Sequence, residues 1–191
     1  MTEGSRERDR ASDLELRVGA LESVFGEADP THLHGAIPFF VGVELGGTPD
    51  IVSFSQYTPQ GKLYVTAELV GSEEQPPNRS GQYELAVCLP EPSEWALDIV
   101  CRLAGYTLKT PLEHGETMDM MPVAPEGSTI SALLFRRIAQ YELFSKPANV
   151  ICCVGITAVE LEFCFARGSR ALMGRMPKDH MATRLSRESY V

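Results

Sequence analysis

The residues with the greatest capacity for chemistry gather in one short segment, from Glu113 to Asp119. It carries three carboxylates, those of Glu113, Glu116 and Asp119, together with the imidazole of His114. Such groups transfer protons when one carboxyl keeps its proton near neutral pH. Exposed loops on a rigid scaffold are also where recognition residues collect. Since nothing in the sequence places these carboxylates in a cleft, we interpret the segment as a polar protein-binding surface, with a hydrolase site as the alternative.

Two further histidines raise the question of a metal site. His32 and His34 form an H-x-H pair in a predicted loop, and two such side chains on an extended segment point the same way. A zinc site needs three or four ligands at set spacings, and no third ligand follows here. We therefore expect loop histidines that bond to the backbone and no metal. A metal-dependent enzyme that uses the loop histidines remains the alternative.

The sequence lacks the usual signatures of catalysis. No GxGxxG or GxxxxGK[ST] motif is present to cradle a nucleotide, and no GxSxG motif is present for a nucleophilic serine. Cys152 and Cys153 are adjacent, a spacing that suits neither zinc nor a redox pair. We expect no enzyme activity and no cofactor, and we interpret both cysteines as buried strand residues.

The elements that position these residues follow two periods. Alternating or continuous apolar runs predict strands, and apolar residues at 3.6-residue spacing predict helices. The run VICCVGI is apolar throughout, which suits a central strand buried on both faces. Several strands in a row early in the chain predict antiparallel neighbours. The predicted strands cover residues 37–45, 51–57, 62–69, 82–89, 130–138 and 149–156.

Three helices are predicted from their start signals. One begins at Leu14 behind an Asp13 cap, and a second opens behind Ser93. The third follows Thr157, with Glu160 three residues later in a capping-box pattern.

The order of the elements indicates the fold class. Strands and helices in this order predict an α/β (α+β) single domain, in which α-helices flank a mixed, largely antiparallel β-sheet. Residues 1–12 are polar and charged and are predicted to be a disordered tail. Residues 13–191 are predicted to form the domain.

Two aromatic residues of the second helix each have two interpretations. Trp95 lies in the first turn and is expected to pack the helix onto the sheet, although it also suits an interface anchor. Tyr106 lies at the end of the helix, next to the acidic segment. A binding hot spot and a half-buried core residue are both compatible with that position.

Composition and charge narrow the class of partner. The net charge of −9 disfavours nucleic acid and favours a basic protein, or serves solubility alone. No apolar run approaches the ~20 residues of a membrane helix, and no apolar stretch follows the charged N-terminus as in a signal peptide. We therefore expect a cytoplasmic protein that does not bind membranes. An odd number of cysteines, five, argues against a disulfide framework.

Several sequence blocks, in their order and spacing, resemble the Suppressor of fused domain, and in particular its short bacterial members. The resemblance covers about residues 60–191. The chain departs from the family pattern at Gly105, where a larger residue is usual, and at Arg184, where Asp is frequent. The blocks are YVTAELVG (64–71), GQYELAVCLP (81–90), EWALDIVCRLAGYTL (94–108), HGETMDM (114–120), VGITAVELEFCFARGSRALMGRM (154–176) and TRLSRESYV (183–191).

The resemblance implies a mixed sheet flanked by helices and no enzyme activity. Animal members of the family restrain a transcription factor by clasping a peptide of it, and bacterial members are interpreted as immunity proteins that neutralise toxins. By position, Tyr106, Glu116 and Asp119 fall near the partner-facing region of the family. Together with Glu113 of the same segment, they are our protein-binding candidates.

The favoured hypothesis is a protein-binding domain of the Suppressor of fused type, acting as an immunity-type inhibitor of a basic toxin or regulatory protein. An acidic inhibitor finds a basic toxin quickly through electrostatic steering. Two alternatives stay open. One is the hydrolase or metal-dependent enzyme described above, and the other is a homodimeric structural or regulatory subunit that pairs through an exposed sheet edge.

Overall fold

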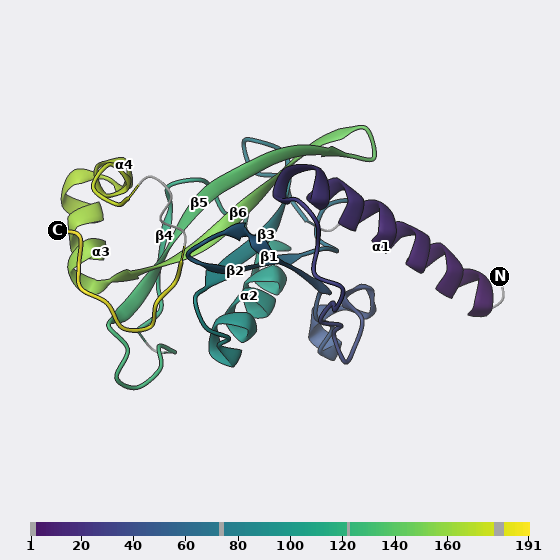
Figure 1. Ribbon diagram of the computed structural model, residues 1–191, viewed down its shortest axis with the longest axis horizontal. Helices are drawn as coiled ribbons and strands as arrows, with labels where there is room; N and C mark the ends of the chain where they lie inside the picture. Colours follow the sequence, from purple (N-terminus) through teal and green to yellow (C-terminus); the bar gives the residue numbers. More distant parts are fainter. Residues whose placement is uncertain (1–2, 73–74, 122, 178–181) are drawn as a thin grey trace.

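The computed structural model describes residues 3–72, 75–121, 123–177 and 182–191. Its centre is a six-stranded sheet in the order β1-β2-β3-β6-β5-β4 (Figure 1). Among the strand pairs of the described residues, β3–β6 is parallel and the other four are antiparallel, so the prediction of a mixed, largely antiparallel sheet is confirmed. The strands are β1 (Ile51–Thr58), β2 (Gly61–Thr66), β3 (Gln82–Leu89), β4 (Thr117–Asp119), β5 (Ile130–Leu143) and β6 (Lys146–Thr157).

Helices cover both faces of this sheet. Helix α2 (Glu94–Thr107) packs on one face, over a core that includes Leu85 and Ile151. The other face carries α1 (Glu3–Phe25), α3 (Ala158–Arg167) and α4 (Ser169–Met173). Figure 1 shows α1 and the α3–α4 pair at opposite ends of the molecule. No helix in the described ranges joins the length and apolarity that a bilayer crossing requires.

The central strand and the helix starts follow the sequence signals. β6 lies between β3 and β5, and Cys152 and Cys153 are buried in it, as predicted. The Ser93 hydroxyl accepts a hydrogen bond from the backbone of Ala96 at the start of α2. At α3, Thr157 and Glu160 exchange the two bonds of a capping box. These caps fix where both helices leave the sheet.

The predicted strand over residues 37–45 is wrong. This segment forms two short 3₁₀ helices, η1 (Phe39–Val41) and η2 (Val43–Leu45). Gly42 has a φ of 107°, a conformation that breaks an extended run and that other residues rarely adopt. The segment packs against α2, because Val43 Cγ1 lies 2.7 Å from the position that a Cβ on Gly105 would occupy. The contact explains why a larger residue is not accommodated at position 105.

Further boundaries differ from the prediction, and β2 ends at Thr66 rather than at Leu69. Helix α1 begins at Glu3 rather than at Leu14, and its predicted stripe is confirmed by the burial of Leu21 and Phe25. The division into a tail of residues 1–12 and a domain of 13–191 stays a prediction. β5 and β6 extend into a long hairpin whose turn holds Phe144 and Ser145 at positive φ. In this extension, the apolar residues Ala139, Tyr141 and Leu143 alternate with the polar residues Gln140 and Glu142.

A C-terminal strap, defined as residues 182–191, runs past neighbouring ends of β3, β6 and β5. It begins beside β3, where the backbone of Thr183 donates to Cys88 O at 2.7 Å. It then passes the start of β5, where Thr129 N donates to Leu185 O at 2.8 Å. Finally, Arg187 reaches Glu160 in the first turn of α3 with a closest contact of 2.6 Å. The strap therefore fixes α3 against the sheet.

Candidate functional site

The two edge strands of the sheet, β1 and β4, differ in whether another segment of the chain covers them. Outside β1, residues 29–33 cover the edge, with Leu33 and Ile51 exchanging both backbone hydrogen bonds. At the other end, β4 pairs with β5 and with no other strand of the described chain. An uncovered strand edge offers backbone donors and acceptors to a further strand. The β4 edge is therefore the place where the sheet can accept one.

The direction of the free backbone groups follows from the hydrogen bonds to β5. Phe135 N donates to Glu116 O at 2.9 Å, and Met120 N donates to Ser131 O at 2.7 Å. Backbone groups alternate in direction along a strand, so those of Thr117 and Asp119 point away from β5. The backbone N–H and C=O groups of Thr117 and Asp119 are therefore directed to the side of β4 that has no neighbouring strand in the described chain.

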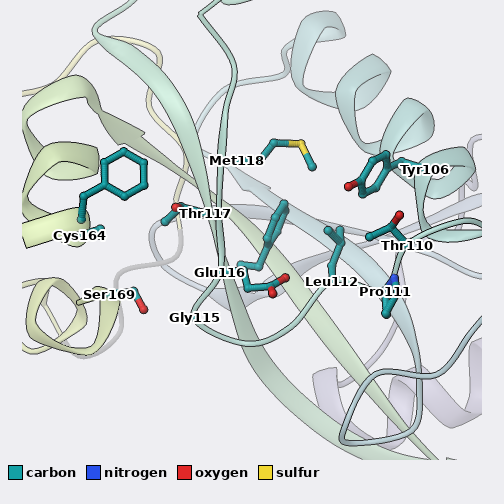
Figure 2. Close-up of a pocket in the computed structure, with 12 residues that line it drawn as sticks. Tyr106, Thr110, Pro111, Leu112, Gly115, Glu116, Thr117, Met118, Cys164 and Ser169 are labelled. Carbon is teal, nitrogen blue, oxygen red and sulfur yellow. The ribbon is translucent and has the colours of Figure 1, made fainter.

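A groove of about 620 Å³ lies along this strand. Figure 2 shows Tyr106 and Met118 on one side of it, Cys164 and Ser169 on the other, and Thr117 between them. Tyr106 comes from the end of α2, whereas Ser169 opens α4, so the groove joins both faces of the sheet at its edge. Its lining is Tyr106, Thr110, Pro111, Leu112, Gly115, Glu116, Thr117, Met118, Phe135, Cys164, Phe165 and Ser169.

Two aromatic side chains of the groove are exposed. The side chain of Phe165 is 77% exposed on α3, and that of Tyr106 is 43% exposed on α2. Large apolar groups left in water at the rim of a groove are typical of binding surfaces, and aromatic residues dominate binding hot spots. Of the two interpretations of Tyr106, its exposure favours a binding residue over a core residue.

The four predicted binding residues are only partly brought together. Tyr106 and Glu116 line the groove, while Glu113 and Asp119 lie outside its lining. Each carboxylate accepts a backbone N–H of its own turn or a neighbouring one. Glu116 accepts from Glu113 at 3.0 Å, Glu113 from Arg79 at 3.0 Å and Asp119 from Met121 at 2.9 Å. These carboxylates shape the backbone around β4.

The imidazole of this segment is held as a neutral group. His114 Nδ1 accepts a hydrogen bond from the backbone N–H of Arg137 at 3.1 Å. Its pKa is lowered by burial and by the positive charges of Arg137, Arg136 and Arg170. A ring that accepts at Nδ1 and is neutral carries its proton on Nε2, where it is a donor.

The H-x-H pair has a local partner. His34 Nδ1 lies 3.1 Å from Asp50 Oδ2, and the rings of His32 and His34 are 6.3 Å apart between centroids. In the part of the chain that is described, no three His, Cys, Asp or Glu side chains come together as metal ligands. His34 and Asp50 thus form a contact that joins the loop to the start of β1.

Trp95 packs as the first of its two interpretations describes. It is partly buried against the core beneath α2, and its Nε1 donates to Val123 O at 2.6 Å. It also lines a second, more apolar groove, which α2 forms together with Met120 and Val123.

Sequence reasoning missed Thr117 and Phe165. Phe165 continues the apolar stripe that includes Leu161, so its spacing resembles that of a core residue. Leu161 and Cys164 fill the core instead, which leaves Phe165 on the outer flank of α3. No local signal marks Thr117, because only the pairing of β4 with β5 shows that its backbone is open.

Comparisons with known proteins identify the fold and the family of the chain. No curated protein sequence matches the chain. Solved structures with the same fold include a Suppressor of fused homologue from Neisseria gonorrhoeae, at 13% identity and a TM-score of 0.66, with 95% of this chain and 98% of that one covered. A chain of a Sufu–Fu complex matches at 15% identity and a TM-score of 0.71, with 93% and 92% covered.

Drosophila Suppressor of Fused matches at 15% identity and a TM-score of 0.69, over 93% of this chain. The match covers 51% of the Drosophila chain, so the present chain spans about half of its length. At these identities the structures establish the fold. The sequence model of the Suppressor of fused protein (SUFU) matches residues 48–188, which include β1 to β6, the groove and most of the C-terminal strap. The chain therefore belongs to the Suppressor of fused family.

Proposed function

We propose that the chain is a non-enzymatic protein-binding domain that holds an extended segment of another protein along the edge of β4. The observation that carries the proposal is an uncovered strand edge with an exposed aromatic side chain on each side, Tyr106 and Phe165. Family membership supports it, since a related Sufu chain was solved in a complex with Fu.

Strand addition explains how the groove is used. A peptide beside β4 pairs its backbone with Thr117 and Asp119, and its side chains alternate between the two faces. One set then lies against Tyr106 and Met118 on the α2 side. The other set lies against Phe165 on the α3 side. Backbone pairing supplies part of the affinity, and the aromatic side chains select the sequence.

We further propose an immunity-type role, in which the partner is a basic toxin. The net charge of −9 supports this role, because it accelerates encounters with a basic protein. Association should therefore slow as salt rises, and a salt-independent association rate would contradict the electrostatic part of the proposal.

The test is a proline at the open edge. Thr117→Pro removes a backbone donor that faces the partner and spares the bonds to β5, whereas Thr117→Val keeps the donor. Both proteins serve as baits in native lysate, and the partner captured by the wild type is then titrated by calorimetry. We expect at least a tenfold loss of affinity for Thr117→Pro and little change for Thr117→Val, with both folds checked by circular dichroism.

A second pair of variants guards against a folding defect. Tyr106→Ala and Phe165→Ala change exposed side chains, so they leave the fold intact while removing the groove contacts. Full affinity in these two variants and in a folded Thr117→Pro protein would overturn the proposed site. If the captured partner is a second copy of this chain, and Thr117→Pro abolishes that dimer, the edge serves self-association instead.

A further inference from the structure

A second groove, of about 400 Å³, lies between α2 and the residues that follow β4. Met120 and Val123 form one wall of it. Helix α2 forms the other wall through side chains that recur every three or four residues and so share one face of the helix. They are Trp95, Ile99, Leu103 and Tyr106. We name this space the α2 groove.

The charged side chains at the α2 groove, and its indole N–H, already have partners. Trp95 Nε1 donates to Val123 O at 2.6 Å, and Asp98 and Arg102 form an ion pair with each other at 2.7 Å. A polar side chain that entered the groove would lose water without finding an unpaired charge in return, whereas an apolar one gains by burial. Val123 is 47% exposed, so the groove already places apolar surface in water. The groove is therefore suited to a large apolar side chain.

The α2 groove is continuous with the groove along β4. Tyr106 lines both, and Figure 2 shows the side chain of Met118 directed towards it. Met118 lines the first groove and Met120 the second, and both pack with the core beneath α2. Met118 pairs with Leu133, which belongs to the same core. These two methionines therefore mark one face of the sheet edge, the α2 face, at successive positions.

The register of an added strand follows from this alternation. In an antiparallel pair, residues directly opposite each other place their side chains on the same face. The residue of the partner opposite Met118 then points to the α2 face, beside Tyr106. The residue opposite Asp119 points to the other face, and the residue opposite Met120 returns to the α2 face at the α2 groove. Two such residues of the partner are about 7 Å apart along the strand.

We propose that the α2 groove takes a second large apolar side chain of the segment added to β4, two residues away from the one that lies beside Tyr106. This inference rests on the proposed function and gives it a sequence requirement. The partner segment carries two large apolar residues separated by one residue whose side chain points to the opposite face. Two adjacent apolar residues do not meet the requirement, because neighbours in a strand point to opposite faces.

Two fluorescent peptides of one composition test the spacing. One has the core Thr-Leu-Thr-Leu-Thr and the other Thr-Thr-Leu-Leu-Thr, both with blocked ends and Gly-Ser flanks. Anisotropy titration of the full chain should show about fivefold or more tighter binding of the peptide with spaced leucines, because only that peptide buries both on the α2 face. Val123→Glu, which places a carboxylate at the groove, should remove this preference. Val159→Glu makes the same substitution at an exposed position outside both grooves and should retain it.

Trp95 reports whether the α2 groove itself is filled. It is the only tryptophan of the chain, and it lines the groove. The peptides contain no tryptophan, so with unlabelled peptides a change in tryptophan emission comes from Trp95 alone. Binding of the peptide with spaced leucines should shift this emission to shorter wavelengths, because an apolar side chain in the groove displaces water from the indole. Binding without such a shift would contradict the inference.

The outcomes separate this inference from the proposed function. If both peptides bind equally and Thr117→Pro blocks them, strand addition stands and the role of the α2 groove is wrong. If the preference for spaced leucines persists in Val123→Glu, with its fold checked by circular dichroism, the groove is likewise wrong. If neither peptide binds, or if Thr117→Pro leaves binding unchanged, strand addition at β4 fails, and the inference fails with it.

Discussion

Two buried carboxylates at different places in the sheet show opposite behaviour. Glu84 of β3 is 1% exposed and Glu160 of α3 is 0% exposed, so both have lost their water. Burial raises the pKa of Glu84 to about 7. The pKa of Glu160 is lowered instead. The difference teaches that the kind of partner, and not the depth of burial, decides the charge of a buried acid.

The partners explain the contrast. Glu84 accepts hydrogen bonds from neutral donors, namely the Thr66 hydroxyl at 2.5 Å and the backbone of Leu69 and Val70. Arg17 adds a favourable charge, yet it donates to a carbonyl rather than to the carboxylate. These contacts offset burial only in part.

Glu160 has a guanidinium in direct contact. Burial alone would raise its pKa, but Arg187 donates two hydrogen bonds to it, at 2.8 and 2.6 Å, and together with the backbone of Thr157 and Tyr190 brings the pKa down. Glu160 lies in the first turn of α3, the helix that carries Phe165. The position of this side of the candidate site therefore depends on an ion pair, Arg187–Glu160, that stays charged. The Glu84 region, next to α1, rests on a group that titrates.

The largest loss of stability should come from removing the Arg187–Glu160 ion pair. Arg187→Met leaves Glu160 buried and unpaired, and such a change typically costs about 3–5 kcal/mol of unfolding free energy at pH 7. Urea unfolding followed by circular dichroism measures it. Arg184→Met, an exposed position on the same strap, is the control and should change stability little. A loss below about 1 kcal/mol for Arg187→Met would show that the strap does not hold α3 in this way.

The pH dependence of Glu84 should come next. Its pKa in the folded protein, about 7, exceeds the ordinary 4.5, so the folded protein keeps a proton that the unfolded chain releases. Stability contributed by this group is complete below pH 4.5 and is lost as pH rises to 7, by roughly 3 kcal/mol. The free energy of unfolding is measured against pH for the wild type and for Glu84→Gln, and the difference between the two curves gives the contribution of Glu84. A flat difference between pH 5 and 8 would contradict the raised pKa.

Glu160 should show the opposite sign. With a pKa lowered from 4.5, its contribution is present above that pH and is lost as the pH falls below it. Unfolding curves of wild type and Glu160→Gln should therefore converge under acid conditions. If their separation instead grows on acidification, the carboxylate of Glu160 does not carry the charge assigned to it.

A smaller loss of stability is expected when a neutral hydrogen-bond donor to Glu84 is removed. Thr66→Val keeps the shape of the side chain and removes the hydroxyl that donates to Glu84 and accepts from Leu85 N. We expect a loss of about 1 kcal/mol at pH 8, where the carboxylate is charged, and a smaller one at pH 5. Equal losses at the two pH values would mean that the hydroxyl does not stabilise the charged form.

Much of the fold follows from local patterns in the sequence. Alternation or continuous apolarity locates β1, β3 and β6, and caps at Ser93 and Thr157 locate the starts of α2 and α3. Residues 37–45 are wrongly predicted as a strand because the segment is mostly apolar, and the pattern of apolar residues does not show that the chain turns at Gly42. The continuation of β5 beyond residue 138 is hidden because the irregularity between Arg137 and Ala139 shifts the apolar alternation by one residue.

The candidate site is less visible in the sequence, because its parts are distant along the chain. Tyr106 and Glu116 stand out as an aromatic residue beside a polar loop. Phe165 and Ser169 do not, since each reaches the site only because α3 and α4 pack beside the β4 edge of the sheet. Position at a sheet edge is a tertiary property, and no window of the sequence encodes it.

The brevity of β4 has a consequence for solubility. Stacking into amyloid needs extended segments of six or seven residues with little charge. β4 has three residues, carries Asp119 and is flanked by Glu116, while the longer opposite edge is covered by residues 29–33. The sheet can therefore keep one edge open for a partner while giving copies of the chain too short a template to aggregate on.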